Sequence, residues 1–125
     1  MLGDHPIYPV LLSTDLAASR AFYHDLLGLE IISESEASID FRSGNTRFNV
    51  NLSSTGTADT QTQAGWAVTD LRAEVEELRR RGVKIEEYDM PGLKTEDGIA
   101  DVGFARIAWI VDPGGNALAI LEAKT

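Results

Sequence analysis

The side chains that commonly hold metal ions or catalyse reactions are sparse in this sequence. The 125 residues include two histidines and no cysteine, so a thiolate zinc site cannot form. His5 lies in the amino-terminal tail, and His24 falls in a predicted helix, where a surface position is the simpler interpretation. Asp40 and Glu86 fall on predicted strands, but no pattern pairs them for acid–base work. With no nucleophile elbow, phosphate loop or dinucleotide-binding turn either, these residues predict no reaction.

An internal repeat positions the remaining polar and aromatic side chains. Residues 8–16 match residues 63–71, and each stretch ends in Thr-Asp-Leu. Residues 44–50 match residues 115–121, and each stretch begins with Gly-Asn. A repeated unit that cannot bury its apolar face alone stacks on a copy of itself. We therefore expect two similar modules that pack together.

The first module is predicted to run βαβββ. An apolar strand over residues 7–13 leads to Thr14 and Asp15, and either side chain can cap the helix that follows. That helix extends to about Leu27 and ends at Gly28, a residue suited to the left-handed conformation after a helix. The pattern then predicts three strands, at residues 29–35, 37–42 and 47–52.

The second module repeats this order with one irregular segment. A strand at residues 63–69 precedes a helix that carries Leu71, Val75 and Leu78 on one face. Further strands are expected at residues 83–88, 104–111 and 116–122. Residues 89–102 form a long loop without periodicity, for which a lid and plain disorder are both open interpretations.

Composition indicates one compact domain over residues 1–125, with module 1 at about 5–52, a polar linker at 53–62 and module 2 at 63–125. The net charge of −9 disfavours nucleic acid as a partner, because such a surface repels phosphate. It suits a cationic ligand, although solubility alone would also explain it. No apolar run approaches the roughly 18 residues of a membrane span, and no signal peptide is apparent. We therefore expect a cytoplasmic protein.

The landmarks of the repeat together resemble the vicinal oxygen chelate superfamily, which includes glyoxalases, extradiol dioxygenases and bleomycin-resistance proteins. The resemblance covers nearly the whole chain and rests on residues 13–16, 21–23, 27–29, 66–71, Arg106 and 112–116. It implies an α+β fold in which two βαβββ modules form a partly closed curved sheet with helices outside. A ligand cavity would then lie on the concave face.

The resemblance also implies where metal ligands would stand. The opening-strand positions fall on Tyr8 and Gln63, and the closing-strand positions on Phe48 and Ala119. A divalent metal requires several imidazole or carboxylate donors, and none of the four residues supplies one. We therefore expect no metal and no other cofactor.

Alternation of side chains along each strand extends this set to a predicted cavity lining. If Tyr8 points into the cavity, Val10 and Leu12 do so too. Trp66 is expected to face the helices, whereas Trp109 fits either cavity or core, and Arg106 fits either an anionic ligand or an ion pair. The predicted ligand-binding residues are Tyr8, Val10, Leu12, Phe48, Val50, Gln63, Arg106, Trp109 and Ala119.

The resemblance is nearest to a metal-free protein of the bleomycin-resistance type, which would sequester a drug or metabolite, as in antibiotic resistance, without converting it. The ligand would be a small molecule, cationic or aromatic, and the assembly a homodimer. Two alternatives are a metal-dependent lyase or dioxygenase with an unusual ligand set and a metal-free enzyme that uses Tyr8 as an acid. A regulatory role without a ligand is a further possibility.

Overall fold

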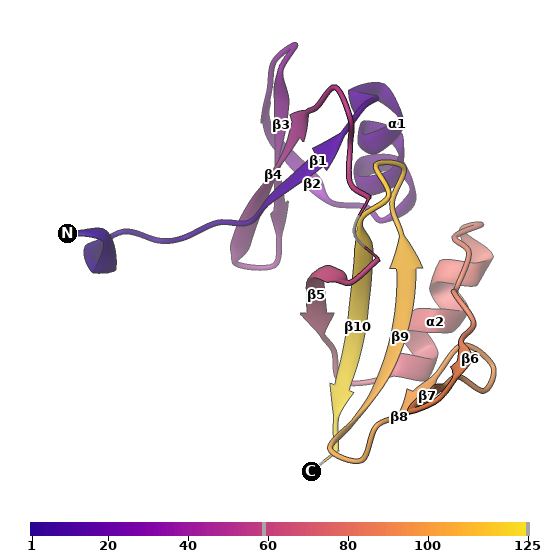
Figure 1. Ribbon diagram of the computed structural model, residues 1–125. Coiled ribbons are helices and arrows are strands. Elements are labelled where there is room, and N and C mark those ends of the chain that lie inside the picture. Colours follow the sequence, from indigo (N-terminus) through magenta and orange to yellow (C-terminus); the bar gives the residue numbers. More distant parts are fainter. Residues whose placement is uncertain (59, 125) are drawn as a thin grey trace.

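The computed structural model describes residues 1–58 and 60–124 and shows an α+β fold with two four-stranded sheets. The first sheet has the order β1 (Val10–Ser13), β4 (Thr46–Leu52), β3 (Ser38–Ser43) and β2 (Glu30–Glu34). The second has the order β5 (Thr62–Ala67), β10 (Ala117–Ala123), β9 (Ala105–Val111) and β8 (Ala100–Asp101). Figure 1 shows one sheet with its helix in each half of the chain. The predicted fold class is confirmed; Asp59, in the expected linker, lies outside the described residues.

The two modules share their strand topology. In each sheet the opening strand pairs in parallel with the closing strand, β1 with β4 and β5 with β10, and the other pairs are antiparallel. The repeated Thr-Asp-Leu begins both helices in the same way, because Asp15 accepts a hydrogen bond from the Ala18 amide and Asp70 accepts one from the Ala73 amide, both at 3.1 Å. The sequence repeat is thus a structural repeat.

The helices differ in form. In module 1, α1 (Leu16–Arg20) continues as a π-helical turn, η2 (Ala21–Leu26), before Gly28 takes a φ of +78°. In module 2, α2 (Leu71–Arg80) is regular and is followed by Gly82 at φ +85°. A short 3₁₀ turn, η1 (Leu2–Asp4), begins the chain. Within the described part of the chain, no helix is long and apolar enough to cross a membrane.

The strand predicted at residues 83–88 is not formed as such, although the segment is extended. Val83 and Ile85 are buried, and the Glu86 amide donates to the Trp109 carbonyl at 2.9 Å. The short β8 takes the edge of the sheet instead, since it pairs with β9 at Ile107 and Arg106. Between them, part of the predicted loop forms a hairpin of β6 (Asp89–Met90) and β7 (Leu93–Lys94).

Both modules contribute to one buried core. Tyr23, Phe41 and Val50 of module 1 belong to the same cluster as Val75 and Leu118 of module 2. Trp66 packs against this cluster, as expected, and its indole N–H donates to the Ser43 hydroxyl at 2.9 Å. The helix-facing sides of both sheets therefore form this core, apart from a smaller pocket of about 230 Å³ beside Trp66, Leu78 and Ile110.

The turn at residues 112–116 joins the modules through buried hydrogen bonds. The Tyr23 hydroxyl donates to the Asp112 carboxylate at 2.5 Å, and the Asn116 amide donates to the same carboxylate and to the Leu12 carbonyl at 2.8 Å. Burial and the charge of Asp112 raise the pKa of the Tyr23 phenol far above its usual range. The neutral form of Tyr23, which can donate this hydrogen bond, is therefore favoured.

Replacing Tyr23 by Phe should lower the free energy of unfolding by about 1–3 kcal/mol, because the Asp112 carboxylate loses a buried donor. Urea denaturation followed by circular dichroism measures this loss. The matched change Tyr8→Phe, at a side chain that is 46% exposed, should fall within about 0.5 kcal/mol of the unmodified protein. Equal stability of all three proteins would contradict the assigned role of this hydrogen bond.

Candidate functional site

A pocket of about 650 Å³ lies on the face of the second sheet that points away from the buried core. β9 shows the division, because Ala108 and Ile110 belong to the core whereas Trp109 and Val111 line the pocket. Residues from the 53–62 segment and from the β6–β7 hairpin form the other walls. The described lining residues are Thr57, Ala58, Thr60, Gln61, Thr62, Glu86, Tyr88, Met90, Leu93, Trp109, Val111, Gly115 and Ala117.

Two aromatic side chains, Tyr88 and Trp109, line this pocket side by side. The rings of Tyr88 and Trp109 lie edge to face, with centroids 5.5 Å apart and an interplanar angle of 89°. The Trp109 indole N–H donates to the Thr62 hydroxyl at 3.2 Å. Because its ring is held on one side by Tyr88 and at its nitrogen by Thr62, Trp109 forms a fixed surface against which a ligand could pack.

Glu86 adds a carboxylate beside the aromatic pair. Its side chain is 23% exposed, and Lys84 lies 3.7 Å from one carboxylate oxygen. Partial burial, together with the Glu86 charge, raises the pKa of the Tyr88 phenol. We did not predict Glu86 or Tyr88 from the sequence. The signal was present, however, because buried Val83 and Ile85 require residues 84, 86 and 88 to point the other way.

Three predicted site residues lie on the first sheet and not in this pocket. Tyr8, Val10 and Leu12 are 46%, 49% and 39% exposed. Val10 and Leu12 occupy the open side of β1, with buried Leu11 between them, and Tyr8 precedes the strand. The Arg47 guanidinium lies 5.1 Å from the centre of the Tyr8 ring, a cation–π distance.

The expectation that Phe48 and Val50 line a cavity is wrong. Val50 is fully buried in the core, and the Phe48 ring packs 5.1 Å from Tyr23 and 5.4 Å from Phe41. The physical reason is the pairing with the opening strand, because Val10 pairs with Asn49 whereas its counterpart Gly65 pairs with Ala119, one residue earlier in the matched sequence. A one-residue difference in register moves every side chain to the opposite face.

The sheet register identifies Asn49 as the true counterpart of Ala119. Asn49 pairs with Val10 as Ala119 pairs with Gly65, and Val10 and Gly65 stand at the same place in the repeat. The Asn49 amide donates to Asp40 at 2.5 Å, and its own oxygen is buried without a hydrogen-bond donor among the described residues. The open face of the first sheet is therefore polar at its centre.

Gln63 and Ala119 lie on the open face of the second sheet but outside the pocket lining. Ala119 pairs with Trp109 across the strands, so the two side chains are neighbours. The ladder between β5 and β10 is irregular at Gln63, where Thr62 pairs with Ala117 and Ala64 with Leu118. Of the nine predicted site residues, Trp109 is therefore the one that the pocket contains.

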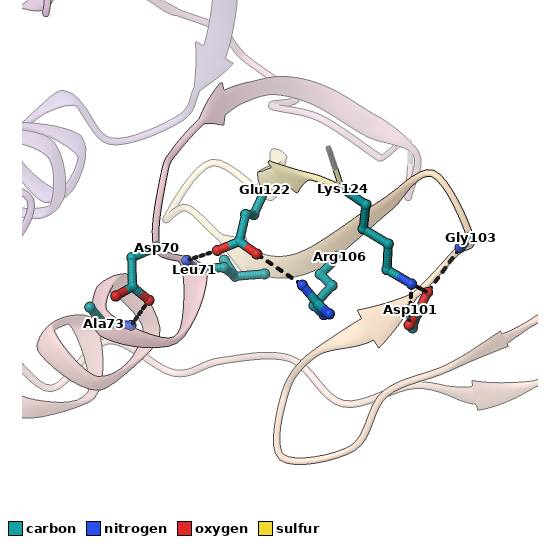
Figure 2. A network of polar contacts seen from close by, with 8 residues as sticks. All are labelled: Asp70, Leu71, Ala73, Asp101, Gly103, Arg106, Glu122 and Lys124. Atoms are coloured by element: carbon teal, nitrogen blue, oxygen red, sulfur yellow. Dashed lines mark hydrogen bonds and ion pairs between the residues drawn. The ribbon is translucent and has the colours of Figure 1, made fainter.

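Arg106 stands on the opposite face of the sheet and cannot reach the pocket. Its guanidinium pairs with Glu122 at 3.0 Å, and the other oxygen of Glu122 accepts the Leu71 amide at 2.9 Å (Figure 2). Placing Arg106 among the ligand-binding residues was wrong, and the ion pair that the sequence left open is the observed arrangement. Its role is to hold the start of α2 against β10.

The donor set does not fit a divalent metal. The four corresponding positions of the repeat hold Tyr8, Asn49, Gln63 and Ala119, which offer a phenol, two amides and a methyl group. Among residues 1–58 and 60–124, no three His, Asp or Glu side chains gather in a way that could hold a metal ion. What the second sheet offers instead is an aromatic pocket with one acid at its wall.

Comparison with known proteins gives a consistent result. A family model described as the Glyoxalase/Bleomycin resistance protein/Dioxygenase superfamily matches residues 5–120. No curated protein matches the chain.

Three solved structures illustrate the similarity. A bleomycin-binding protein from bleomycin-producing Streptomyces verticillus, complexed with copper(II)-bleomycin, is 25% identical with a TM-score of 0.69 over 97% of both chains. A glyoxalase/bleomycin resistance protein/dioxygenase from Alicyclobacillus acidocaldarius is 14% identical, with a TM-score of 0.73 over 98% of this chain and 93% of that one. A lactoylglutathione lyase from Agrobacterium tumefaciens is 22% identical, with a TM-score of 0.65 over 94% and 92%. The last two similarities concern the fold.

The pKa of the Asp40 carboxyl group tests whether the hydrogen bond from Asn49 forms on the open face of the first sheet. The Asn49 amide, then Ser33 and Arg47, hold the pKa of Asp40 below its usual value, although partial burial opposes them. Because the pKa of Asp40 is lower in the folded state than in the unfolded state, its carboxylate stabilises the folded protein at pH values above the unfolded-state pKa. This stabilisation is lost as the pH falls through the folded-state pKa. Asn49→Ala should therefore raise the pKa of Asp40 toward 3.8 and remove part of this acid-side pH dependence.

Carbon-detected NMR titration of the Asp40 carboxyl measures the change. Asn51→Ala, on the same strand and the same face, is the matched control and should leave the titration unchanged. An Asp40 titration that does not respond to loss of the Asn49 amide would overturn the assignment.

Proposed function

The chain belongs to the glyoxalase/bleomycin resistance protein/dioxygenase superfamily, and we propose that within it this protein binds and sequesters a small molecule without converting it. The pocket beside Trp109 and Tyr88 is the observation that carries the proposal. Its volume of about 650 Å³ is of the size that holds drug-like molecules, and its walls combine apolar side chains with a few polar groups.

The chemistry of the site favours binding over catalysis. Tyr8, Asn49, Gln63 and Ala119 stand at the four positions where the resemblance would put metal ligands, and they offer no imidazole or carboxylate. The metal-dependent alternative therefore lacks ligands for its metal at these positions. The metal-free alternative relied on Tyr8, which belongs to the first sheet and is absent from the described lining of the pocket. An aromatic surface held in place by its neighbours is suited to packing against a flat ligand.

The bleomycin-binding protein of Streptomyces verticillus supports the same class of function. It is similar over 97% of both chains and was crystallised with copper(II)-bleomycin. The lactoylglutathione lyase shares the fold at 22% identity, and a shared fold does not carry an activity. We therefore use copper(II)-bleomycin as the first probe and do not assign it as the ligand.

Trp109→Ala should weaken ligand binding about 30-fold or more, because truncating a central aromatic anchor typically costs about 2 kcal/mol or more. Isothermal titration calorimetry with copper(II)-bleomycin and a panel of aromatic metabolites measures the affinity. Phe104→Ala is the matched control, since Phe104 is 71% exposed and does not line the pocket. Equal loss in both variants, or no binding to the unmodified protein across the panel, would count against the proposal.

We also propose that the protein is a homodimer. The open side of β1 exposes Val10 and Leu12, which are 49% and 39% exposed. A run of exposed apolar side chains on a sheet indicates a contact surface. Light scattering after size-exclusion chromatography should therefore give twice the 13.6 kDa mass of one chain. Leu12→Glu should shift the measured mass toward that of one chain. A single-chain mass for the unmodified protein would refute the proposed homodimer.

A further inference from the structure

We propose that the pocket selects a positively charged aromatic ligand and that Glu86 sets this charge preference. The inference rests on the proposed function, because it names the ligand class of the same pocket. The pocket would distinguish a cation from a neutral molecule of equal shape through Glu86 and the two aromatic side chains beside it.

The backbone fixes Glu86 beside the aromatic pair. Its amide donates to the Trp109 carbonyl at 2.9 Å, so residue 86 lies next to residue 109 on the edge of the sheet. Buried Val83 and Ile85 turn alternate side chains of this segment toward the core, which leaves Glu86 and Tyr88 on the pocket side. A ligand that packs on Trp109 is therefore within reach of the carboxylate.

The charge of Glu86 is not balanced inside the pocket. Of the lining residues that the structure describes, Glu86 is the charged one, and the others are apolar, hydroxyl, amide or backbone groups. Lys84 lies 3.7 Å away, but its side chain is 83% exposed, and an exposed pair of this kind contributes little. A ligand cation can therefore replace Lys84 at small cost and gain a shorter, less hydrated ion pair.

The aromatic side chains add to the same preference. Trp and Tyr rings attract cations that approach their faces, most strongly where water is excluded. Tyr88 is partly buried beside Trp109 and Glu86 in the pocket wall, and this burial together with the Glu86 charge raises the pKa of its phenol. A net charge of −9 on the chain adds a weak long-range attraction for cations.

A pair of isosteric probes tests charge selection directly. N-methylquinolinium is a planar aromatic cation, and N-methyl-2-quinolone is a neutral molecule of nearly the same shape. The unmodified protein should bind the cation about tenfold more tightly than the neutral probe, as expected for a partly buried ion pair. Calorimetry, with NMR shifts of the Trp109 indole as the site-specific readout, measures both affinities.

Glu86→Gln should weaken binding of the cation and so reduce the tenfold preference to the small part that the aromatic rings and the net charge contribute. Circular dichroism of the variant checks that it remains folded. Glu86→Asp should keep part of the preference. Glu76→Gln is the matched control, because it removes the same charge from an exposed position on α2 and should keep the full tenfold difference.

The outcomes separate this inference from the proposed function. Equal binding of both probes at Trp109, or a full tenfold preference that survives Glu86→Gln, would overturn charge selection by Glu86 while small-molecule binding stands. Failure of both probes to bind, or binding that leaves the Trp109 indole unshifted, would overturn both statements.

Discussion

The buried Asp112 carboxylate is the interaction on which the arrangement of the two modules depends. It accepts hydrogen bonds from the Tyr23 hydroxyl in module 1 and from the Asn116 amide and the Gly114 backbone in module 2. A buried charge is costly unless donors surround it, and here the donors come from both modules. The modules must therefore pack together for this charge to be satisfied. The turn itself is shaped by this contact, because a Cβ at Gly114 would lie 2.3 Å from the Leu12 carbonyl oxygen.

When the two modules pack together around Asp112, one face of each sheet lies in the core and the other face remains open. In β9, Ala108 and Ile110 are buried while Trp109 lines the pocket, so adjacent residues lie in the core and in the pocket wall. The same division holds in the extended segment before β6, where Ile85 is in the core and Glu86 is in the pocket wall. Substitutions in the pocket are thus expected to change affinity more than stability, which is what makes the binding variants interpretable.

The repeat allowed the fold to be predicted because Thr-Asp-Leu and Asp-Pro-Gly-Gly-Asn correspond to local structures, the two helix caps and the joining turn. It was harder to predict which side chains of each strand face the core, because side-chain direction depends on the register of the strands. In the first sheet Asn49, and not Phe48, pairs at the position that Ala119 has in the second, and the pairing of β5 with β10 is irregular at Gln63. Sequence matching across the Gly-Asn pair could not detect either feature. Phe48 was therefore placed in the cavity and Asn49 was missed. Arg106 was misplaced for a different reason: its partner Glu122 lies across the ladder, on the helix side.

The corrected register shows that the two open faces have diverged. At corresponding positions module 1 has Asn49, whose amide is already bonded to Asp40, and module 2 has Ala119 beside Trp109. A shared metal would require both faces to present matching donors to one ion, and neither does so. A pocket needs only one face with space above it, and the small side chains of Ala117 and Ala119 leave that space next to the large indole. The difference between the modules therefore leaves the aromatic pocket on the second sheet, whereas the open side of the first sheet has a polar network and exposed apolar side chains.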